Sequence, residues 1–312
     1  MQIFDAAATR EALPFDRLIP ALRTMFATGC TVPQRHVHEI ASAEGLQFTS
    51  LIMPAWTEGR YYGVKVINIA RGNAMRGLPG LHASYVLYDA VTGVPLALID
   101  ADQITTRRTA AASALAASYL ARADASRLLV VGAGQIARLI PDAYRAVRAI
   151  ERVTVWARSP DQADRLADEL RRDGFAASAV RDLEGAAGEA DIVACATPAT
   201  APLICGRWLR PGTHLDLTGS FTPAMREADD ECFIGASWFV DTEEALEKSG
   251  DLLGPVSRGV LLVSDVGGSL TTLARGETAG RRSAEERTVF KSVGTALEDL
   301  AAAIQVFERA RF

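Results

Sequence analysis

The sequence predicts a two-domain protein of the α/β class, and three features of the chain support this prediction. Its 312 residues, 49% of them hydrophobic, are enough to bury about two separate cores. The middle of the chain alternates short apolar runs with amphipathic segments, which is typical of parallel strands joined by helices. The first part of the chain instead joins apolar runs through short turns, which predicts an antiparallel sheet.

In that first part we expect an amphipathic helix from Pro14 to Ala27 and strands from Leu51 to Trp56 and from Tyr61 to Ala70. The turn TEGR joins these two strands, and the turn AVTG joins the later runs ASYVLYD and VPLALID into a hairpin. The first domain is therefore expected to be an α+β domain built on an antiparallel sheet.

Lys65 is the unusual residue of the second strand. Strict alternation places it on the same face as Gly63, Ile67 and Ile69, and that face is otherwise apolar. Such a lysine commonly runs its stem along the surface and keeps its charge in water. Alternatively it is half-buried beside a substrate, with a depressed pKa.

The Ala-rich stretch before residue 121 predicts a long helix, with Thr105 or Thr106 as the residue that caps its start. Arg107 and Arg108 would then lie in the first turn, where the partial positive charge of the helix disfavours cations. Paired arginines there indicate a bound carboxylate or phosphate. We expect this role for Arg108, and for Arg107 a side chain that reaches solvent or a neighbouring aspartate.

The segment that follows carries the clearest motif. A short apolar run, Leu128 to Val131, leads directly into a G-x-G-x-x-A turn that opens a helix. Gly132 permits the tight turn, Gly134 lets a pyrophosphate approach the backbone, and Ala137 allows close helix packing. The sequence therefore predicts a Rossmann doubly wound parallel sheet that binds a dinucleotide.

The end of the next strand indicates which dinucleotide. An acid at this position usually holds the ribose hydroxyls of NAD, whereas an arginine suits the 2′-phosphate of NADP. The strand VTVWA ends in Arg158 and Ser159, and Ser159 can also cap a helix that starts at Pro160. NADP(H) is the preferred cofactor on this pattern, and NAD(H) remains possible.

Later strands end in small polar residues. Thr197 and Pro198 follow one strand, and Thr218, Gly219 and Ser220 follow the next, so we expect them to line the ligand crevice at the carboxyl edge of the sheet. His214 and Asp216 share one face of that second strand and could form a proton relay. A structural role is favoured, because His214 lies far from the ligand edge.

The C-terminal segment is expected to form a long amphipathic helix that begins near Thr288 and packs on the first domain. The predicted domains are therefore 1–115 together with 288–312, and 116–287 for the dinucleotide-binding domain. In this arrangement the C-terminal helix completes the α+β domain.

Composition excludes several classes of protein. The 33 basic and 38 acidic residues give a net charge of −5, which disfavours nucleic acid and anionic membranes as partners. The four cysteines form no framework, and neither a signal peptide nor a membrane span is expected, so we predict a cytoplasmic protein. His36 and His38 share a strand face, but no further ligand completes a metal site.

Several motifs, in this order, resemble the ornithine cyclodeaminase/mu-crystallin family from about Val32 to the C-terminus. They are VPQR, GVK, GLPG with YVLYDAVTG, DADQITTRRTAAASA, VVGAGQIA and FKSVGTALEDLAAA. The resemblance implies that Arg35, Lys65 and Arg108 hold the substrate carboxylate, with Val293 near the substrate. It also implies homodimers formed through the N-terminal domain. The residues implied at the cofactor are Arg108, Gly132, Gly134, Gln135, Ile136, Arg158, Ser159, Thr197, Leu217, Thr218, Gly219, Ser220 and Ser292.

One departure from the family decides the expected activity. Cyclodeaminases carry an aspartate as catalytic base where this chain has Ser220, and a serine cannot readily supply that base. LTGSFTPAMREAD resembles the ketimine reductase branch. We therefore predict NAD(P)H-dependent reduction of 1-pyrroline-2-carboxylate or 1-piperideine-2-carboxylate, with Lys65 and Ser220 as catalytic residues.

Three alternatives remain open at this point. The first is an NAD-dependent ornithine cyclodeaminase in which Asp216 or water replaces the missing base. The second is an amino-acid dehydrogenase of the alanine type. The third is a non-catalytic protein that binds NADPH and a small ligand, as mu-crystallin does.

Overall fold

The computed structural model describes residues 1–42 and 45–309, and its internal contacts divide the chain into two compact units. Unit 1 comprises Met1–Arg108 and Thr295–Phe312, and unit 2 comprises Thr109–Gly294. Both units combine helices with a sheet, which confirms the predicted α/β fold class. The division falls inside a helix, at Arg108, and after the last strand of unit 2.

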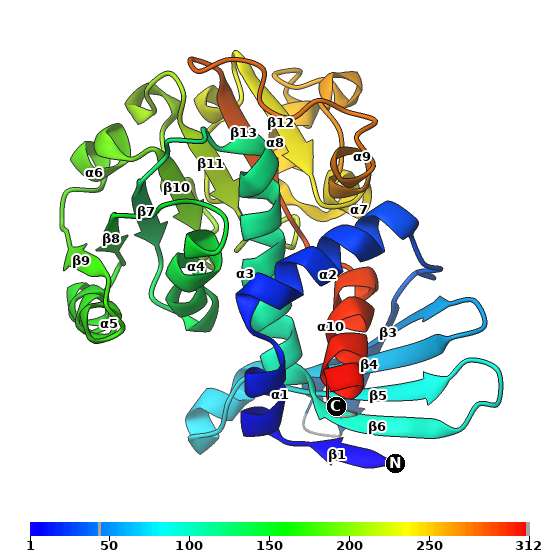
Figure 1. Cartoon of the computed structure of the whole chain (residues 1–312). Coiled ribbons are helices and arrows are strands. Elements are labelled where there is room, and N and C mark those ends of the chain that lie inside the picture. The colour runs from blue at the N-terminus through cyan, green and yellow to red at the C-terminus, as the bar shows by residue number, and fades with distance from the viewer. Residues whose placement is uncertain (43–44, 310–312) are drawn as a thin grey trace. The chain divides into compact units, whose positions relative to one another are not determined.

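Unit 1 is built on a six-stranded sheet in the order β1-β6-β5-β4-β3-β2. Strands β2 to β6 are antiparallel neighbours, and β1 adds parallel to β6 (Figure 1). The turn pattern predicted the antiparallel sheet of β3 to β6, whereas β2 was not predicted. The strands are β1 (Gln2–Phe4), β2 (His36–Ser42), β3 (Gly45–Thr57), β4 (Tyr61–Ile69), β5 (Leu81–Asp89) and β6 (Pro95–Asp100).

Helices cover one face of this sheet. Helix α10 packs against α2 and against strands β3 to β6, and its buried side chains include Leu300, Val306 and Phe307. Leu18, Leu22 and Phe26 of α2 complete this core. The helices of unit 1 are α1 (Ala6–Ala12), α2 (Phe15–Thr28), the short 3-10 helix η1 (Arg71–Arg76) and α10 (Ala296–Arg309).

Unit 2 contains a seven-stranded sheet in the order β12-β13-β11-β10-β7-β8-β9, and all its strands are parallel. From β7 the chain first builds outward through β8 and β9 and then returns to the other side of β7 with β10. The strand order therefore reverses between β7 and β10, which is where doubly wound sheets bind their ligands. The strands are β7 (Arg127–Val131), β8 (Arg152–Trp156), β9 (Ala176–Ala179), β10 (Ile192–Cys195), β11 (His214–Leu217), β12 (Ala236–Val240) and β13 (Arg287–Lys291).

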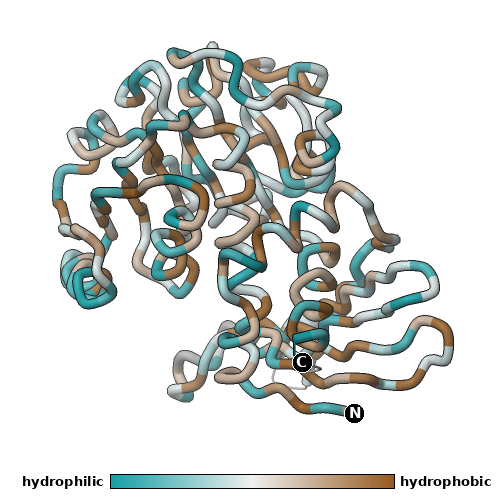
Figure 2. The backbone as a smooth tube through the Cα atoms, in the orientation of Figure 1, coloured by the Kyte–Doolittle hydropathy of each residue, from teal (hydrophilic) through white to brown (hydrophobic). Residues whose placement is uncertain are grey.

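The central strands of unit 2 are fully buried. Strands β10 and β11 are buried at every position, as parallel strands covered on both faces should be. Helix α5 buries only its apolar stripe and turns a charged face outward, so most of it is teal in Figure 2. The helices are α4 (Gln135–Arg145), α5 (Pro160–Arg172), α6 (Leu183–Glu189), α7 (Glu244–Lys248), α8 (Gly250–Ser257), α9 (Leu270–Ala274), η2 (Gly206–Trp208), η3 (Asp230–Cys232) and η4 (Val263–Asp265).

The start of helix α3 (Ala101–Leu120) corrects one prediction. The helix begins at Ala101 rather than near Thr105, because the carboxylate of Asp100 accepts a hydrogen bond of 2.8 Å from the Gln103 amide. Arg107 and Arg108 therefore lie in the second turn. The prediction that they face the positive end of a helix was wrong.

The predicted start of the C-terminal helix was also wrong. Residues from Arg287 to Lys291 form strand β13, which pairs with both β11 and β12, and the helix starts at Ala296. The run Thr288 to Lys291 is buried at all four positions, as a central strand requires, and Gly294, at φ 77°, separates it from the helix. None of the helices in residues 1–42 and 45–309 has both the length and the apolar character needed to cross a membrane.

Candidate active site

In unit 1, Lys65 lies at the centre of β4 with its side chain toward the covered face of the sheet. It is 1% exposed, so its stem does not carry the charge to water. Its Nζ lies 2.6 Å from Oδ2 of Asp299 and donates a hydrogen bond of 3.4 Å to the Thr105 hydroxyl. Of the two interpretations of Lys65, the structure supports the buried one.

Arg108 reaches the same carboxylate from α3. Its Nε donates a hydrogen bond of 3.0 Å to Oδ1 of Asp299, and its Nη1 donates one of 2.5 Å to Glu298. Both acids belong to α10 and are fully buried. Asp299 therefore holds the two predicted substrate cations side by side, and each buried cation is balanced by an acid.

The sequence interpretation missed Glu298 and Asp299. Their signal was two adjacent acids, in the motif ALEDLAAA, within an otherwise apolar helix. Acids are almost never fully buried unless they are paired. The pattern therefore predicts buried cationic partners, although it cannot say which ones.

Burial changes the protonation of these groups. Burial, together with the neighbouring charge of Arg108, lowers the pKa of Lys65 to about 8, while Asp299 and Glu298 oppose that shift. Burial alone would raise the pKa of Asp299, but the charges of Lys65 and Arg108 outweigh it and lower that pKa. The arrangement is a buried aspartate beside an ammonium group that can lose its proton near neutral pH.

Arg35 and Arg107 occupy different surroundings. Arg35 is half-buried and immediately precedes β2. In the sheet, its neighbour His36 pairs with Ile52 of β3, and Ile52 pairs with Val66 of β4, the residue after Lys65. Arg35 and Lys65 thus lie at a similar level of the sheet, two strands apart. Arg107 is buried rather than solvated, since its Nε donates to Leu13 O at 2.7 Å and its guanidinium lies 4.4 Å from the Phe15 ring centre.

Tyr85 is a further polar residue on this face that the sequence interpretation missed. It lies directly opposite Lys65 in β5 and is 1% exposed, and its hydroxyl has no hydrogen-bond partner among the described residues. A side chain at Gly63 would stand 2.0 Å from that hydroxyl, which explains the glycine of the GVK motif. Buried hydroxyls are normally paired, so this one is available to a bound substrate.

In unit 2, the glycine turn has the geometry of a phosphate cradle. Gly132 has a φ of 121°, and a side chain there would stand 2.6 Å from the Ala196 carbonyl. Gly134 precedes α4, is exposed, and has nothing within 4 Å of the position a side chain would take. The first-turn N–H groups of α4 have no partner within the helix. A dinucleotide pyrophosphate fits this open helix end.

Arg158 and Ser159 lie where the sequence predicted, between β8 and α5. Ser159 is the capping residue of α5, but its hydroxyl makes no capping hydrogen bond. Within the described part of the chain, the exposed guanidinium of Arg158 makes no hydrogen bond or ion pair. Both side chains are therefore available to a cofactor group.

Ser220, one of the two expected catalytic residues, has a hydroxyl that is bound within the protein. Ser220 is fully buried, and its hydroxyl accepts a hydrogen bond of 2.9 Å from Lys291 Nζ and donates to Asp251. Lys291 Nζ also donates to Leu217 O at 2.8 Å and lies 3.4 Å from Asp251. The hydroxyl is thus committed within the protein, to two charged residues that the sequence interpretation missed.

His214 and Asp216 do not bond each other. His214 Nδ1 lies 3.0 Å from the Thr288 hydroxyl, and burial lowers its pKa to about 3. Asp216 accepts hydrogen bonds from Tyr144 at 2.8 Å and Thr218 at 3.1 Å, and burial raises its pKa to about 6. These contacts support the structural interpretation of the pair.

Ser292 and Val293 follow β13, beside the end of β11. The Ser292 amide donates to Leu217 O at 3.2 Å, and the Val293 amide donates to Asp241 at 2.8 Å. The ends of β10, β11 and β13 therefore carry the remaining predicted cofactor residues on three adjacent strands.

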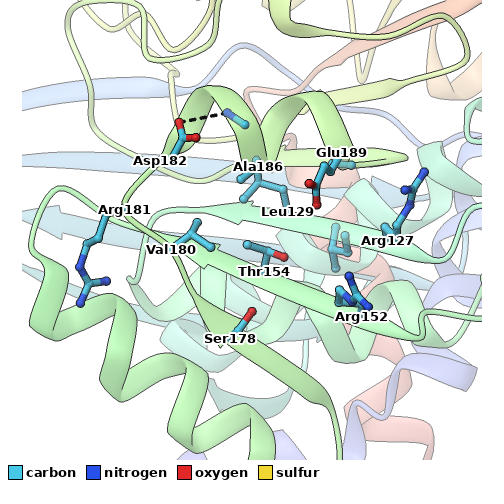
Figure 3. A pocket seen from close by; sticks show the side chains of 13 residues that line it. Arg127, Leu129, Arg152, Thr154, Ser178, Val180, Arg181, Asp182, Ala186 and Glu189 are labelled. Carbon is cyan, nitrogen blue, oxygen red and sulfur yellow. Dashed lines mark hydrogen bonds between the residues drawn. The ribbon is translucent and has the colours of Figure 1, made fainter.

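A hollow of about 440 Å³ opens on the face of β7, β8 and β9 beneath α6 (Figure 3). Arg127, Arg152 and Glu189 lie at one end of it and Arg181 and Asp182 at the other. None of the predicted cofactor residues lines it, so it is distinct from the glycine turn.

Among the described residues no group of three or more metal-ligating side chains occurs, and the exposed His36 and His38 rings stack 6.4 Å apart.

Comparison with known proteins relates both units to one group of enzymes. The profile of the ornithine cyclodeaminase/mu-crystallin family matches residues 8–312. A Delta(1)-pyrroline-2-carboxylate reductase of Paracoccus denitrificans is 44% identical over 276 residues, which cover 87% of this chain and 86% of that protein.

Solved structures are similar over the whole chain. The Delta(1)-pyrroline-2-carboxylate reductase of Thermococcus litoralis, in complex with NADH and L-proline, has a TM-score of 0.93 and 32% identity, covering 100% of this chain and 98% of that one. An archaeal alanine dehydrogenase dimer with bound NAD has a TM-score of 0.92 and 30% identity, covering 100% and 96%.

Proposed function

Because this chain belongs to the ornithine cyclodeaminase/mu-crystallin family, we propose that it reduces a cyclic ketimine, 1-pyrroline-2-carboxylate or 1-piperideine-2-carboxylate, to the cyclic amino acid with NAD(P)H. The observation that carries this proposal is the buried pair of Lys65 and Arg108 on one carboxylate. It provides two cations for a substrate carboxylate and, in Lys65, an acid that can release a proton near neutral pH.

The carboxylate of the imino acid binds to Arg108, Lys65 and Arg35. A planar guanidinium binds a carboxylate through two parallel hydrogen bonds, which fixes its orientation. Lys65 has three N–H donors, and Asp299 and Thr105 account for two of them. The third is left for the substrate.

Lys65 also supplies the proton of the reaction. Reduction of the C=N bond requires a hydride at carbon and a proton at nitrogen. An ammonium group whose pKa is about 8 is a stronger acid than an ordinary lysine and transfers its proton to the imine nitrogen more readily. Asp299 holds that ammonium group in place and stabilises its charge.

The dinucleotide is held by residues of unit 2. Gly134, Gln135 and Ile136 at the start of α4 would hold its pyrophosphate, and Arg158 and Ser159 would bind a 2′-phosphate, which favours NADP(H) over NAD(H). The ends of β10, β11 and β13 contact the other half of the molecule. When bound, the reduced nicotinamide supplies the hydride.

The likeness to the alanine dehydrogenase supports a second candidate, the reductive amination of an open-chain 2-oxo acid. The same cations would hold its carboxylate. Cyclodeamination of ornithine is disfavoured, because Ser220 replaces the base and its hydroxyl is bound to Lys291 and Asp251.

We also propose a homodimer formed through unit 1. A reducing compartment such as the cytoplasm would keep the four cysteines as the free thiols they are here.

The deciding experiment follows the oxidation of NADPH and of NADH with each cyclic imino acid, and with pyruvate plus ammonia, by the loss of nicotinamide absorbance. Oxidation with the imine alone is expected, with a lower KM for NADPH. In parallel, ornithine and NAD are assayed for ammonia. Ammonia from ornithine without net cofactor change, or oxidation only with pyruvate and ammonia, would overturn the proposal.

A further inference from the structure

Glu227 lies in the loop after β11, within the motif LTGSFTPAMREAD, but the sequence analysis gave it no role. It is fully buried, and its carboxylate accepts four hydrogen bonds. Oε1 accepts from the Thr197 amide at 2.7 Å and the Thr197 hydroxyl at 2.8 Å. Oε2 accepts from the Gly219 amide at 2.8 Å and the Ser220 amide at 3.2 Å. Each carboxylate oxygen therefore binds a different turn.

These two turns follow neighbouring strands. The β10–β11 ladder ends at the pair Cys195 and Leu217, and beyond it the chains are not paired as strands. The two turns still touch, because a side chain at Gly219 would stand 2.1 Å from the Thr197 carbonyl oxygen. Glu227 thus links the segments after β10 and β11 at the point where strand pairing between them has ended.

The backbone around Glu227 is itself fixed. The amides of Glu227 and Ala228 donate to Oδ1 of Asp251 at 2.8 and 3.0 Å. The Glu227 carbonyl accepts from Leu203 and Ile204 at 2.8 and 3.0 Å. Asp251 also accepts a hydrogen bond from the Ser220 hydroxyl, and Lys291 Nζ lies 3.4 Å from its carboxylate. A carboxylate anchored in this way can hold two turns rigidly.

We propose that Glu227 is a positioning residue for the nicotinamide half of the cofactor, because it fixes the turns at Thr197 and at Gly219–Ser220. This inference rests on the proposed function. In a doubly wound sheet the dinucleotide extends across the point where the strand order reverses. With Arg158 beyond β8 at the adenosine end, the ends of β10 and β11 meet the nicotinamide end.

The hydrogen bonds specify the chemical form of Glu227. Three of the four partners are backbone amides, which only donate, so the hydrogen bonds and the nearby Lys291 favour the ionised carboxylate, while burial raises its pKa to about 7. In Glu227→Gln an NH₂ group replaces one acceptor and faces N–H or O–H donors. One of the two turns is then left without its partner, while the size of the side chain is unchanged.

The test measures dinucleotide binding to Glu227→Gln and to the unsubstituted protein by titration. One titrant is the reduced dinucleotide, NADH or NADPH, that the unsubstituted protein binds. The other is the matching ADP-ribose fragment. The fragment lacks nicotinamide. We expect the Kd of the dinucleotide to rise about tenfold, the scale for losing hydrogen bonds to a charged group. The Kd of the fragment should stay unchanged, which a general folding defect would not produce.

Asp191→Asn is the matched control. Asp191 is also a buried acid that accepts two backbone amides, Ser126 at 3.2 Å and Arg127 at 3.0 Å, but it lies at the opposite end of β10. Its substitution should lower thermal stability without changing the ratio of the two Kd values. The proposal would be overturned if Glu227→Gln lost affinity equally for the dinucleotide and the fragment, or if it lost affinity for neither.

A second measurement needs no variant. Within the part of the chain that the structure describes, the amides of Thr197, Gly219 and Ser220 bond only to Glu227, so hydrogen exchange should find them protected in the unsubstituted protein. Rapid exchange there would also overturn the inference. If the protein instead protected these amides but bound no dinucleotide, the proposed function would fail while the structural role of Glu227 stood.

Discussion

Lys65 is the residue on which the proposed chemistry depends most directly. Lys65→Ala removes both a carboxylate ligand and the proton donor, and it leaves Asp299 buried beside Arg108 alone. We expect kcat/KM for the imine to fall by about 2 to 5 kcal/mol of transition-state stabilisation, the scale for removing one partner of a desolvated pair. Steady-state kinetics with thermal unfolding as a check on folding measure this.

Arg60→Ala provides the matched control for that variant. Arg60 is a cation next to the same strand, but its side chain is 70% exposed and its ion pair with Glu308 is superficial. Its loss should leave kcat/KM unchanged. Full activity in Lys65→Ala would remove Lys65 from the mechanism.

The pH dependence of activity reports the same residue. Lys65 is protonated below its pKa of about 8 and loses its proton as the pH rises through that value, so kcat/KM should fall on the alkaline side. The Asp299 carboxylate raises this pKa, and Asp299→Asn should therefore move the alkaline limb to lower pH. In Lys65→Arg the limb should disappear, because a guanidinium does not deprotonate in this range. If the alkaline limb of the kcat/KM profile did not move in Asp299→Asn, it would report the titration of a group other than Lys65.

Single residues were predicted from the sequence where local pattern or family resemblance identified them. Alternation placed Lys65 on the covered face, and the resemblance selected Arg108 although the helix argument for it was wrong. Asp299 was missed because its partners lie far away along the chain, and Glu227 and Asp251 because their partners are brought together by irregular loops that carry no sequence period. Only the folded structure shows which donors a buried carboxylate meets.

The turn between β7 and α4 gives a test at the level of one element. Gly134 has φ −80° and ψ −174°, which alanine adopts freely, and a methyl group there meets nothing within 4 Å. Gly134→Ala should therefore fold with normal stability, but its methyl group would occupy the approach of the pyrophosphate. We expect the Kd for the dinucleotide to rise roughly tenfold, equivalent to about 1.4 kcal/mol.

Gly132→Ala separates this effect from damage to the fold. Gly132 has a φ of 121° and no room beside the Ala196 carbonyl, so this variant should lower the unfolding temperature. Thermal unfolding and dinucleotide titration of both variants make the comparison. A Gly134→Ala protein that binds as tightly as the unsubstituted one would mean that the phosphates lie elsewhere.

Elements with a strong local signal were predicted well, and those defined by their neighbours were not. The strand, glycine turn and helix of β7 and α4 follow from sequence alone, as does the antiparallel pairing of β3 to β6. Strand β13 was assigned to a helix because it stands next to one, and its five residues carry no period of their own. Its identity as a strand comes from β11 and β12 on either side.

For the whole molecule, unit 1 presents an edge that a second chain could cover. Strand β2 is the last strand of its sheet and is exposed along its full length, with Val37 58% and Ile40 41% exposed. An exposed apolar edge strand is normally blocked or paired. The proposed homodimer would pair here, so light scattering after size exclusion should give twice the 33.3 kDa of one chain.

Introducing charge at this edge tests whether the dimer forms there. The double variant Val37→Glu with Ile40→Glu should elute as a single chain, because pairing would then bury two carboxylates without partners. Val91→Glu is the control, since Val91 is 74% exposed in the turn between β5 and β6, away from this edge. It should remain dimeric. A double variant that stays dimeric would place the interface on another surface of the chain, and an unsubstituted protein of single-chain mass would exclude the dimer altogether.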